Sequence, residues 1–286
     1  MAVPARADTM DGADIEDGDD TTEHAFADGN LAGTVRVGAT VRRAAGPWTP
    51  AVHALLRHLA ERGFGAAPRP LGLDAEGRET LGFLPGVTAP ATLEGFLGDD
   101  VLTGVARLLR TYHDAVVDFE PPPDAAWRFV VGSPREGEVI CHNDVSPFNV
   151  VFVDGEPRGL IDWDFAAPGP RTWDLGYALL RFAPMYADGA FGPPAERGRR
   201  IARFLGSYGT AETVGPLGGD AVMSLVETRE RSLLATQRAW AAAGVPGFAE
   251  MIRDGHDLAV ERDLTYLDQH RAAIADAIDR EMTMGR

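Results

Sequence analysis

Four polar side chains in the middle of the chain have the types and spacing that phosphoryl transfer needs. His142, Asp144 and Asn149 follow a short apolar run, and Asp162 ends a second apolar run thirteen residues after Asn149. In such chemistry one carboxylate orients and deprotonates a hydroxyl, while an amide oxygen and another carboxylate hold the Mg²⁺ that neutralises nucleotide phosphates. A buried histidine ahead of the first carboxylate could fix the loop by hydrogen bonding. The set therefore suits phosphoryl transfer from a metal-bound nucleotide.

Ordinary loop chemistry is the competing interpretation of the same residues. An Asn-Asp-x-x-Pro segment can simply form a turn, and Asn149 could cap the end of a strand. That interpretation must also explain why Asp162 ends an apolar strand, and why a β-rich N-terminal third precedes a helical C-terminal half. The order of the elements favours the chemical interpretation.

The sequence pattern of the N-terminal third predicts an antiparallel sheet and one helix. Thr49, Pro50 and the apolar spacing of Val52, Leu55 and Leu59 predict an amphipathic helix that ends before Gly63. Short apolar or β-branched runs separated by turn residues predict strands over 24–26, 34–37, 40–43, 70–73 and 79–84. Pro85-Gly86 then breaks the last strand, which makes it a natural hinge.

The remainder of the chain is mainly helical. Short β runs are predicted only within 138–164, around the polar loop and the second acidic pair. Helix-like apolar spacing predicts helices over 93–97, 101–113, 173–182, 195–208, 221–243 and 248–278. The fold class is thus α+β, with an acidic flexible tail over 1–23, a β-rich N-lobe over 24–86 and a helical C-lobe over 87–286.

The His-x-Asp-x-x-x-x-Asn pattern, followed at this interval by an apolar-apolar-Asp strand end, resembles the aminoglycoside phosphotransferase and choline kinase family, which has the protein kinase-like fold. The resemblance extends over residues 24–280, and its specific part lies within 139–177. It implies ATP as cofactor, with GTP still open, together with Mg²⁺. It also implies that Asp144 is the catalytic base, that Asn149 and Asp162 ligate Mg²⁺, and that His142 organises the loop.

The same resemblance implies roles for two further acidic residues. Asp164 lies where choline kinase-like members have a second acid, so it could contact the metal or the substrate. Asp174, in Arg171-Thr172-Trp173-Asp174-Leu175, resembles the family's aspartate at a helix start, which braces the catalytic loop.

The sequence departs from the kinase pattern at the phosphate-binding lysine, because all 27 basic residues are arginines. Arg42 or Arg43 on the strand over 40–43 must take its place, since neighbours on a strand face opposite sides. Arg42 is favoured because it directly follows the apolar Val41, and the alternative is that both arginines are merely solvated. An arginine binds phosphate bidentately, so the replacement is chemically sound.

Two other expected features are weak. The helix over 49–62 has no acid before Glu61 to pair with the cation, although His53 or His58 could stand near that position. The segment from Asp28 to Gly33 has two glycines where a phosphate-covering loop belongs, without the GxGxxG spacing.

Composition narrows the range of partners. The 286 residues carry a net charge of −16 and include one cysteine, Cys141, so an intramolecular disulfide is excluded. The acidic balance disfavours nucleic acid and anionic membranes and suits a neutral or cationic small molecule. The longest apolar runs are short and the N-terminus is acidic, which favours a cytoplasmic protein; the oligomeric state stays open.

The sequence indicates the binding site of the phosphate acceptor less clearly than the catalytic residues. Acids on the predicted C-terminal helices could line a pocket for amino groups, although charge runs on helices are usually solvated faces. These acids are Glu227, Glu230, Asp254, Asp257, Glu261, Asp263 and Asp268.

The preferred interpretation is transfer of the γ-phosphate of ATP to a hydroxyl of a small molecule: an aminoglycoside-like natural product, an amino alcohol or a sugar. The alternative is a kinase-like module that binds a nucleotide or a small molecule and has lost catalysis, which the missing lysine and glutamate would permit. Retention of the whole His142, Asp144, Asn149 and Asp162 set speaks against that alternative, because a binding protein needs no base.

Overall fold

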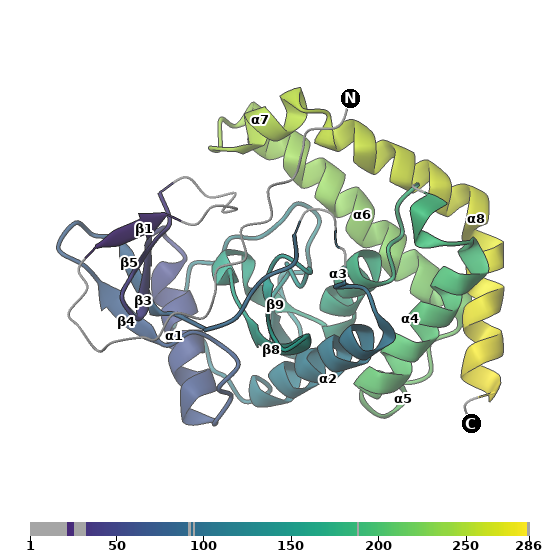
Figure 1. Cartoon of the computed structure of the whole chain (residues 1–286), viewed down its shortest axis with the longest axis horizontal. Coiled ribbons are helices and arrows are strands. Elements are labelled where there is room, and N and C mark those ends of the chain that lie inside the picture. The colour runs from purple at the N-terminus through teal and green to yellow at the C-terminus, as the bar shows by residue number, and fades with distance from the viewer. Residues whose placement is uncertain (1–21, 26–32, 91–92, 94, 188, 285–286) are drawn as a thin grey trace.

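The structure, a computed structural model, describes residues 22–25, 33–90, 93, 95–187 and 189–284. Most of the predicted acidic tail, and all of the Asp28–Gly33 segment except Gly33, lie outside these residues. Glu23, which was predicted to end the tail, is the first residue of a strand. Figure 1 shows a small β-rich lobe on one side of the molecule and a larger helical lobe on the other.

The small lobe is one antiparallel sheet of five strands in the order β1-β2-β3-β5-β4. The strands are β1 Glu23–Ala25, β2 Val35–Val37, β3 Thr40–Arg43, β4 Pro70–Leu73 and β5 Glu79–Gly82. Helix α1, Thr49–Glu61, follows β3, and its Val52, Leu55 and Leu59 are fully buried. The register pairs Arg43 of β3 directly with Glu79 of β5.

The two lobes are joined through a backbone pairing. Val87 exchanges both backbone hydrogen bonds with Phe152, at 2.9 and 2.8 Å. Gly86 has φ of 141°, and a Cβ atom there would lie 2.5 Å from the Phe152 carbonyl oxygen. Only glycine fits at this position without displacing the backbone. The predicted hinge is thus a glycine beside a strand of the large lobe.

Two small β-ladders lie at the centre of the large lobe and carry the polar loop. In one ladder β6, Val139–Cys141, pairs with β9, Ala167–Gly169. In the other, β7, Val150–Val153, pairs with β8, Glu156–Leu160. A short 3₁₀ helix, η1 Trp163–Phe165, links β8 to β9, and the Trp163 side chain is completely buried.

Helices make up the rest of the large lobe and pack around these ladders (Figure 1). They are α2 Asp99–Ala115, α3 Arg171–Phe182, η2 Gly189–Phe191, α4 Pro194–Tyr208, α5 Thr210–Thr213, α6 Gly219–Ala242, α7 Phe248–Arg253 and α8 His256–Met284. One hydrophobic cluster of buried residues extends from α1 through the ladders to α8. This is the predicted α+β arrangement of a β-sheet region followed by a helical region.

Two of the predicted helices were wrong in detail. Of the predicted helix over 93–97, the described residues 93 and 95–97 are not helical, because Leu93 and Gly95 have φ of 57° and 78°, which a right-handed helix excludes. The single helix predicted over 248–278 is two helices, α7 and α8, separated at Gly255, whose φ is 78°. Apolar spacing alone does not detect either break.

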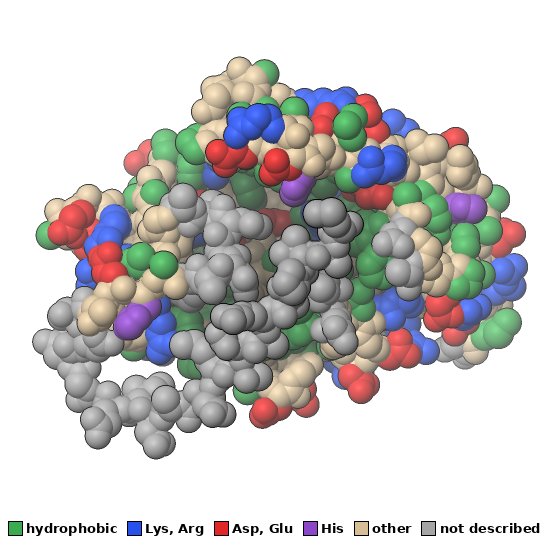
Figure 2. All heavy atoms as spheres, turned by 45° about the horizontal axis from the view of Figure 1, so that its top comes forward, with side chains coloured by type: hydrophobic (Ala, Val, Ile, Leu, Met, Phe, Trp, Pro, Cys, Tyr) green, Lys and Arg blue, Asp and Glu red, His purple; other side chains and the backbone are tan. Residues whose placement is uncertain are grey.

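The charged surface is mixed in sign. On the face drawn in Figure 2, acidic and basic side chains are interspersed over the helical lobe. No helix among the described residues is long and apolar enough to cross a membrane.

Candidate active site

The polar loop that follows β6 is anchored by a buried carboxylate. Asp174, in the first turn of α3, is completely buried and accepts the backbone N–H groups of His142 and Asn143, each at 2.7 Å. Its Oδ2 also contacts His113 Nε2 at 3.1 Å. Burial alone would raise the pKa of Asp174, but the contacts with His113 and His142 hold the pKa below its ordinary value. The loop is thus braced by an ionised carboxylate.

Removal of this brace should be costly. We expect Asp174→Ala to lower the free energy of unfolding by about 3–5 kcal/mol, because two buried N–H groups and the His113 ring lose their shared partner. Urea unfolding followed by circular dichroism measures the loss. The matched control is Asp118→Ala, whose half-exposed carboxylate pairs with Arg62 and should contribute at most about 1 kcal/mol. Equal losses in the two variants would contradict the bracing role.

His142 connects the loop to the strand end that carries the second acid. The ring is buried, donates from Nε2 to the Ile161 carbonyl oxygen at 3.1 Å, and accepts from the Asp144 backbone N–H through Nδ1 at 3.3 Å. Burial lowers the pKa of His142, against the raising effect of Asp174. A neutral ring with one donor and one acceptor nitrogen satisfies both hydrogen bonds. The geometry agrees with the loop-organising role implied by the sequence.

Asp144 and Asn149 are in direct contact. The Asn149 side-chain amide donates from Nδ2 to Asp144 Oδ2 at 2.9 Å and to the Asp144 backbone carbonyl at 3.0 Å. This orientation leaves the Asn149 amide oxygen without a hydrogen bond among the described residues. The Asn149 backbone carbonyl accepts from the N–H of Ile161, the residue before Asp162. The structure therefore brings Asp144, Asn149 and Asp162 to one place.

The backbone at Asp162 directs its carboxylate into the same region. Asp162 has φ of 63° and ψ of 67°, a left-handed conformation that aspartate tolerates better than most residues. Its Oδ1 accepts from Arg43, and Asp164 lies two residues further along, in η1. Burial raises the pKa of Asp164, and the charge of Arg43 opposes this. The two aspartates share one cation from the other lobe.

The donor set suits Mg²⁺ with partial coordination by protein. A free amide oxygen on Asn149 and the second carboxylate oxygen of Asp162 are the hard oxygen ligands that Mg²⁺ accepts. The described residues contain no cluster of three or more His, Cys, Asp or Glu side chains placed to bind a metal. A metal ion here would thus complete its coordination with phosphate oxygens and water rather than with a protein cage.

Arg43, and not the favoured Arg42, faces this region. Its guanidinium donates to Asp162 Oδ1 at 2.9 Å and to Asp164 Oδ1 at 2.6 Å, and only 8% of the side chain is exposed. Arg42 faces the other side of the sheet, where its guanidinium lies 4.0 Å from Asp74 and the side chain is 31% exposed. The prediction that Arg42 and Arg43 face opposite sides of the sheet is correct. The preference for Arg42 as the residue that faces the polar loop is wrong.

The acid that pairs with this cation comes from a strand instead of a helix. Glu79 Oε2 accepts from Arg43 Nε at 2.5 Å, and Glu79 Oε1 contacts His53 Nε2 of α1 at 2.9 Å. Burial would raise the pKa of Glu79, but its contacts with His53 and Arg43 lower it. A histidine on the helix, as the sequence suggested, thus supports an acid that the sequence did not reveal. The only sequence signal for a buried Glu79 is that it lies two residues before Leu81 on a strand, so that both side chains point to the same, buried face.

We expect the two arginines to behave differently. Arg43→Ala should weaken nucleotide binding by about ten- to a hundredfold, because a guanidinium contributes charge-assisted hydrogen bonds of about 1.5–3 kcal/mol. Arg42→Ala, at the next residue and on the other face, should leave the affinity unchanged. Titration calorimetry with a nucleotide measures both constants, and the melting temperature of each variant verifies its fold. Two unaffected variants would mean that no arginine of β3 holds the phosphates.

A second, partly buried cation near Asp164 escaped the sequence analysis. The Arg128 guanidinium lies 4.5, 4.9 and 4.7 Å from the ring centres of Trp48, Phe165 and Trp240. It is also 3.9 Å from Asp164 Oδ2. Burial lowers the pKa of Arg128, and the aspartate opposes this. Aromatic faces stabilise such a cation, so Arg128 is held beside the acidic pair.

Comparison with known proteins agrees with this geometry. Residues 124–213, which include the loop, Asp162 and Asp174, match the model of the phosphotransferase enzyme family. Over 183 residues the chain is 36% identical to the trifolitoxin immunity protein of Rhizobium leguminosarum bv. trifolii, covering 61% of this chain and 69% of that protein. The chain belongs to the phosphotransferase enzyme family. Membership confirms the family resemblance predicted from the His142–Asn149 pattern and makes the chain a small-molecule kinase of that family.

Solved structures of the phosphotransferase family's fold are similar over nearly the whole chain. A choline/ethanolamine kinase family protein from Mesorhizobium loti aligns with a TM-score of 0.56 and 15% identity, covering 91% of this chain and 94% of that one. An amicoumacin kinase in complex with AMP-PNP and Ca²⁺ aligns with a TM-score of 0.55 and 12% identity, covering 89% and 88%. The kinase-like fold is thereby confirmed.

Proposed function

We propose that this phosphotransferase moves the γ-phosphate of ATP, bound with Mg²⁺, to a hydroxyl group of a small molecule. The observation that carries the proposal is the double role of Asn149. Its side-chain amide holds Asp144 at 2.9 Å, and its backbone carbonyl holds Ile161, next to Asp162. A base for the acceptor and a carboxylate for the metal are thus fixed relative to each other through one residue.

Asp144 is the group that receives the acceptor proton. As the hydroxyl proton passes to the Asp144 carboxylate, the acceptor oxygen forms a bond to the γ-phosphorus. The bond from that phosphorus to the oxygen bridging to the β-phosphate breaks, and its electron pair leaves with ADP. The Asn149 amide and the His142 ring keep the carboxylate directed toward the acceptor throughout.

Asn149 and Asp162 would hold Mg²⁺ through their free oxygens. When bound, the ion neutralises phosphate charge. Arg43 and Arg128, both close to Asp164, supply further positive charge beside the nucleotide. Glu79 and His53 fix the direction of the Arg43 guanidinium, which is the task of the helix glutamate in other kinases.

An aminoglycoside-like natural product, an amino alcohol or a sugar could serve as acceptor. The immunity protein, by its name, counters a toxin, which supports a natural product. The named choline/ethanolamine and amicoumacin kinases support nucleotide-dependent transfer to small molecules in this fold. The opposing hypothesis, a binding module without catalysis, rested on the missing lysine and glutamate. The Arg43–Glu79 ion pair removes much of its basis.

The deciding experiment is a screen of nucleotide turnover against a panel of hydroxylated metabolites and antibiotics, with ATP and GTP in parallel. We expect ADP release that depends on one class of acceptor, and a product heavier than that acceptor by one phosphoryl group in the mass spectrum. Tight nucleotide binding without turnover on any acceptor would favour the binding module instead.

A further inference from the structure

Glu230 of α6 is a buried carboxylate without a hydrogen bond. Its residue exposure is 1%, its Oε2 is enclosed and unpaired, and neither oxygen has a hydrogen-bond partner among the described residues. Buried polar groups in folded proteins are nearly always paired, because an unpaired one keeps its full desolvation penalty. Burial raises the pKa of Glu230 to about 7, with Arg181 acting in the opposite direction. A carboxylate that is buried at such a cost in desolvation free energy indicates a ligand that would pair with it.

A partly buried arginine of α3, Arg181, also has an unpaired donor. Arg181 donates to the hydroxyls of Tyr177 and Tyr186 at 3.1 and 3.2 Å, and its Nε is enclosed without a partner. Arg181 and Glu230 attract each other electrostatically, yet no ion pair within 4.0 Å joins them in the described part of the chain. Two opposite charges thus remain separated, and each has an enclosed polar atom without a hydrogen bond among the described residues.

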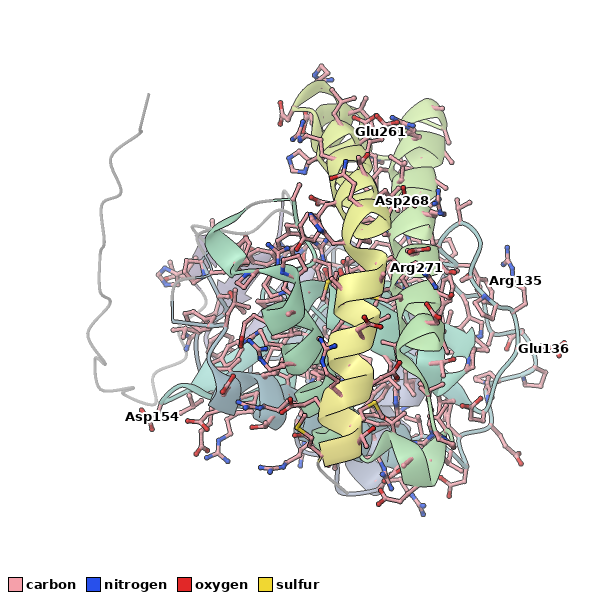
Figure 3. All side chains as sticks on the ribbon, turned by 90° about the vertical axis from the view of Figure 1, so that its right-hand side faces the viewer. Arg135, Glu136, Asp154, Glu261, Asp268 and Arg271 are labelled. Carbon is pink, nitrogen blue, oxygen red and sulfur yellow. The ribbon has the colours of Figure 1, made fainter. Side chains whose placement is uncertain are left out.

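A second acid, Asp263 of α8, completes the group. Its Oδ1 accepts the backbone N–H of Ala187 at 2.7 Å, and Ala187 follows Tyr186, whose hydroxyl accepts from Arg181. Burial also raises the pKa of Asp263. We call Arg181, Glu230 and Asp263 the α3–α6–α8 charge cluster. Figure 3 shows α6 and α8 side by side.

Neighbouring acids of the same helices are satisfied at the surface. Glu227 pairs with Arg271 at 2.6 Å, and Glu261 pairs with Arg238 at 2.8 Å. The labelled Glu261 and Arg271 in Figure 3 belong to this outer set. The general expectation of a solvated charged face therefore holds for them. It does not hold for Glu230, which lies less than one helical turn from Glu227 and is buried.

The charge cluster lies one tyrosine away from the proposed base. The Tyr177 ring has the Arg181 guanidinium 5.1 Å from its centre on one side and that of Arg229 at 4.7 Å. Burial raises the pKa of Tyr177, and the charge of Asp144 raises it further. Arg229 in turn donates to the backbone carbonyl of Asn143 at 2.9 Å. Tyr177 and Arg229 thus form a chain of contacts from Arg181 of the cluster to Asn143, the residue before Asp144.

We propose that the α3–α6–α8 charge cluster is the acceptor subsite, and that it selects a small hydroxylated zwitterion, with the ammonium group at Glu230 and Asp263 and the carboxylate at Arg181. This inference rests on the proposed function, because it deepens the identity of the acceptor. The balance of charge favours a zwitterion over a polycation. The two acids of the cluster are matched by Arg181 and the adjacent Arg229, whereas several ammonium groups would need an excess of unpaired acids.

Binding to three matched probes tests the proposal without relying on turnover. L-homoserine carries a hydroxyl, an ammonium and a carboxylate; 3-amino-1-propanol lacks the carboxylate, and 4-hydroxybutyrate lacks the ammonium. In calorimetry with the full chain, saturated with ADP and Mg²⁺, we expect L-homoserine to bind at least tenfold tighter than either partial probe. Equal affinities for all three probes, or tighter binding of either partial probe than of L-homoserine, would overturn the zwitterion assignment.

Variants locate the binding in the cluster. Glu230→Gln should abolish the preference for L-homoserine over 4-hydroxybutyrate, and Glu227→Gln, on the same helix but partly exposed and paired with Arg271, should leave it intact. Asp263→Asn gives the same test at a less buried position if Glu230→Gln does not fold. Unchanged preference in the folded variant would overturn the proposal. A wild-type chain that binds ADP with Mg²⁺ but none of the probes refutes the subsite alone, whereas absence of nucleotide binding refutes the proposed function.

Discussion

Asp144→Asn should lower turnover by about 10² or more while nucleotide affinity changes little. The amide cannot take the acceptor proton, yet its oxygen can still accept from Asn149 Nδ2, so the loop should keep its shape. Steady-state kinetics with the acceptor found by the screen gives the turnover, and calorimetry with ATP gives the affinity. An unchanged turnover number would remove Asp144 from the mechanism.

The control for this variant is Asp154→Asn. Asp154 lies in the turn between β7 and β8, where it is exposed and has φ of 53°. Asparagine tolerates this left-handed conformation as aspartate does. The substitution therefore removes the same charge without touching the site, and turnover should stay at the wild-type value. A loss in both variants would indicate a general effect of charge.

Asp162→Ala should abolish the dependence of nucleotide binding on magnesium. Without this carboxylate the proposed metal site would retain only Asn149 as a protein ligand, so the ion would bind weakly and compensate less of the phosphate charge. Calorimetric titration with ATP, with and without Mg²⁺, measures the effect. We expect wild type to bind ATP more tightly with the ion, and the variant to show one weak affinity under both conditions.

A second substitution separates the carboxylate from the backbone. Alanine in the left-handed conformation of Asp162 costs about 1–2 kcal/mol, whereas asparagine adopts it more readily. Asp162→Asn should therefore lose the magnesium dependence and keep more of the stability in thermal unfolding. If wild type itself binds ATP equally with and without the ion, Asp162 is not a metal ligand.

The grouping of the polar loop residues could be predicted from the sequence because it depends on short-range spacing. His142, Asp144 and Asn149 lie within eight residues, and a hairpin places Asp162 beside them. The large-scale division into a sheet region and a helical region followed from periodicity in the same way. These features depend on neighbours along the chain, which the sequence displays directly.

The remaining parts of the site depend on register and burial across long separations. Arg43 meets Glu79 because β3 pairs with β5 in one particular register, 36 residues apart. Alternation along a strand shows that only one of Arg42 and Arg43 faces Asp162 and Asp164, but it does not determine which one. Glu230 likewise shares its helix and spacing with surface acids, and only the packing of α3 and α8 buries it.

The contact of Arg43 with Asp162 and Asp164 would make nucleotide binding an exchange of partners. In the structure the guanidinium already pairs with both carboxylates of the other lobe. A bound Mg²⁺ would pair with the aspartates in its place, and the phosphates would pair with the arginine. The net free energy is therefore a difference between two sets of ion pairs. Free Mg²⁺ and free nucleotide should each bind weakly, because each alone would leave one member of the old set without a counter-charge.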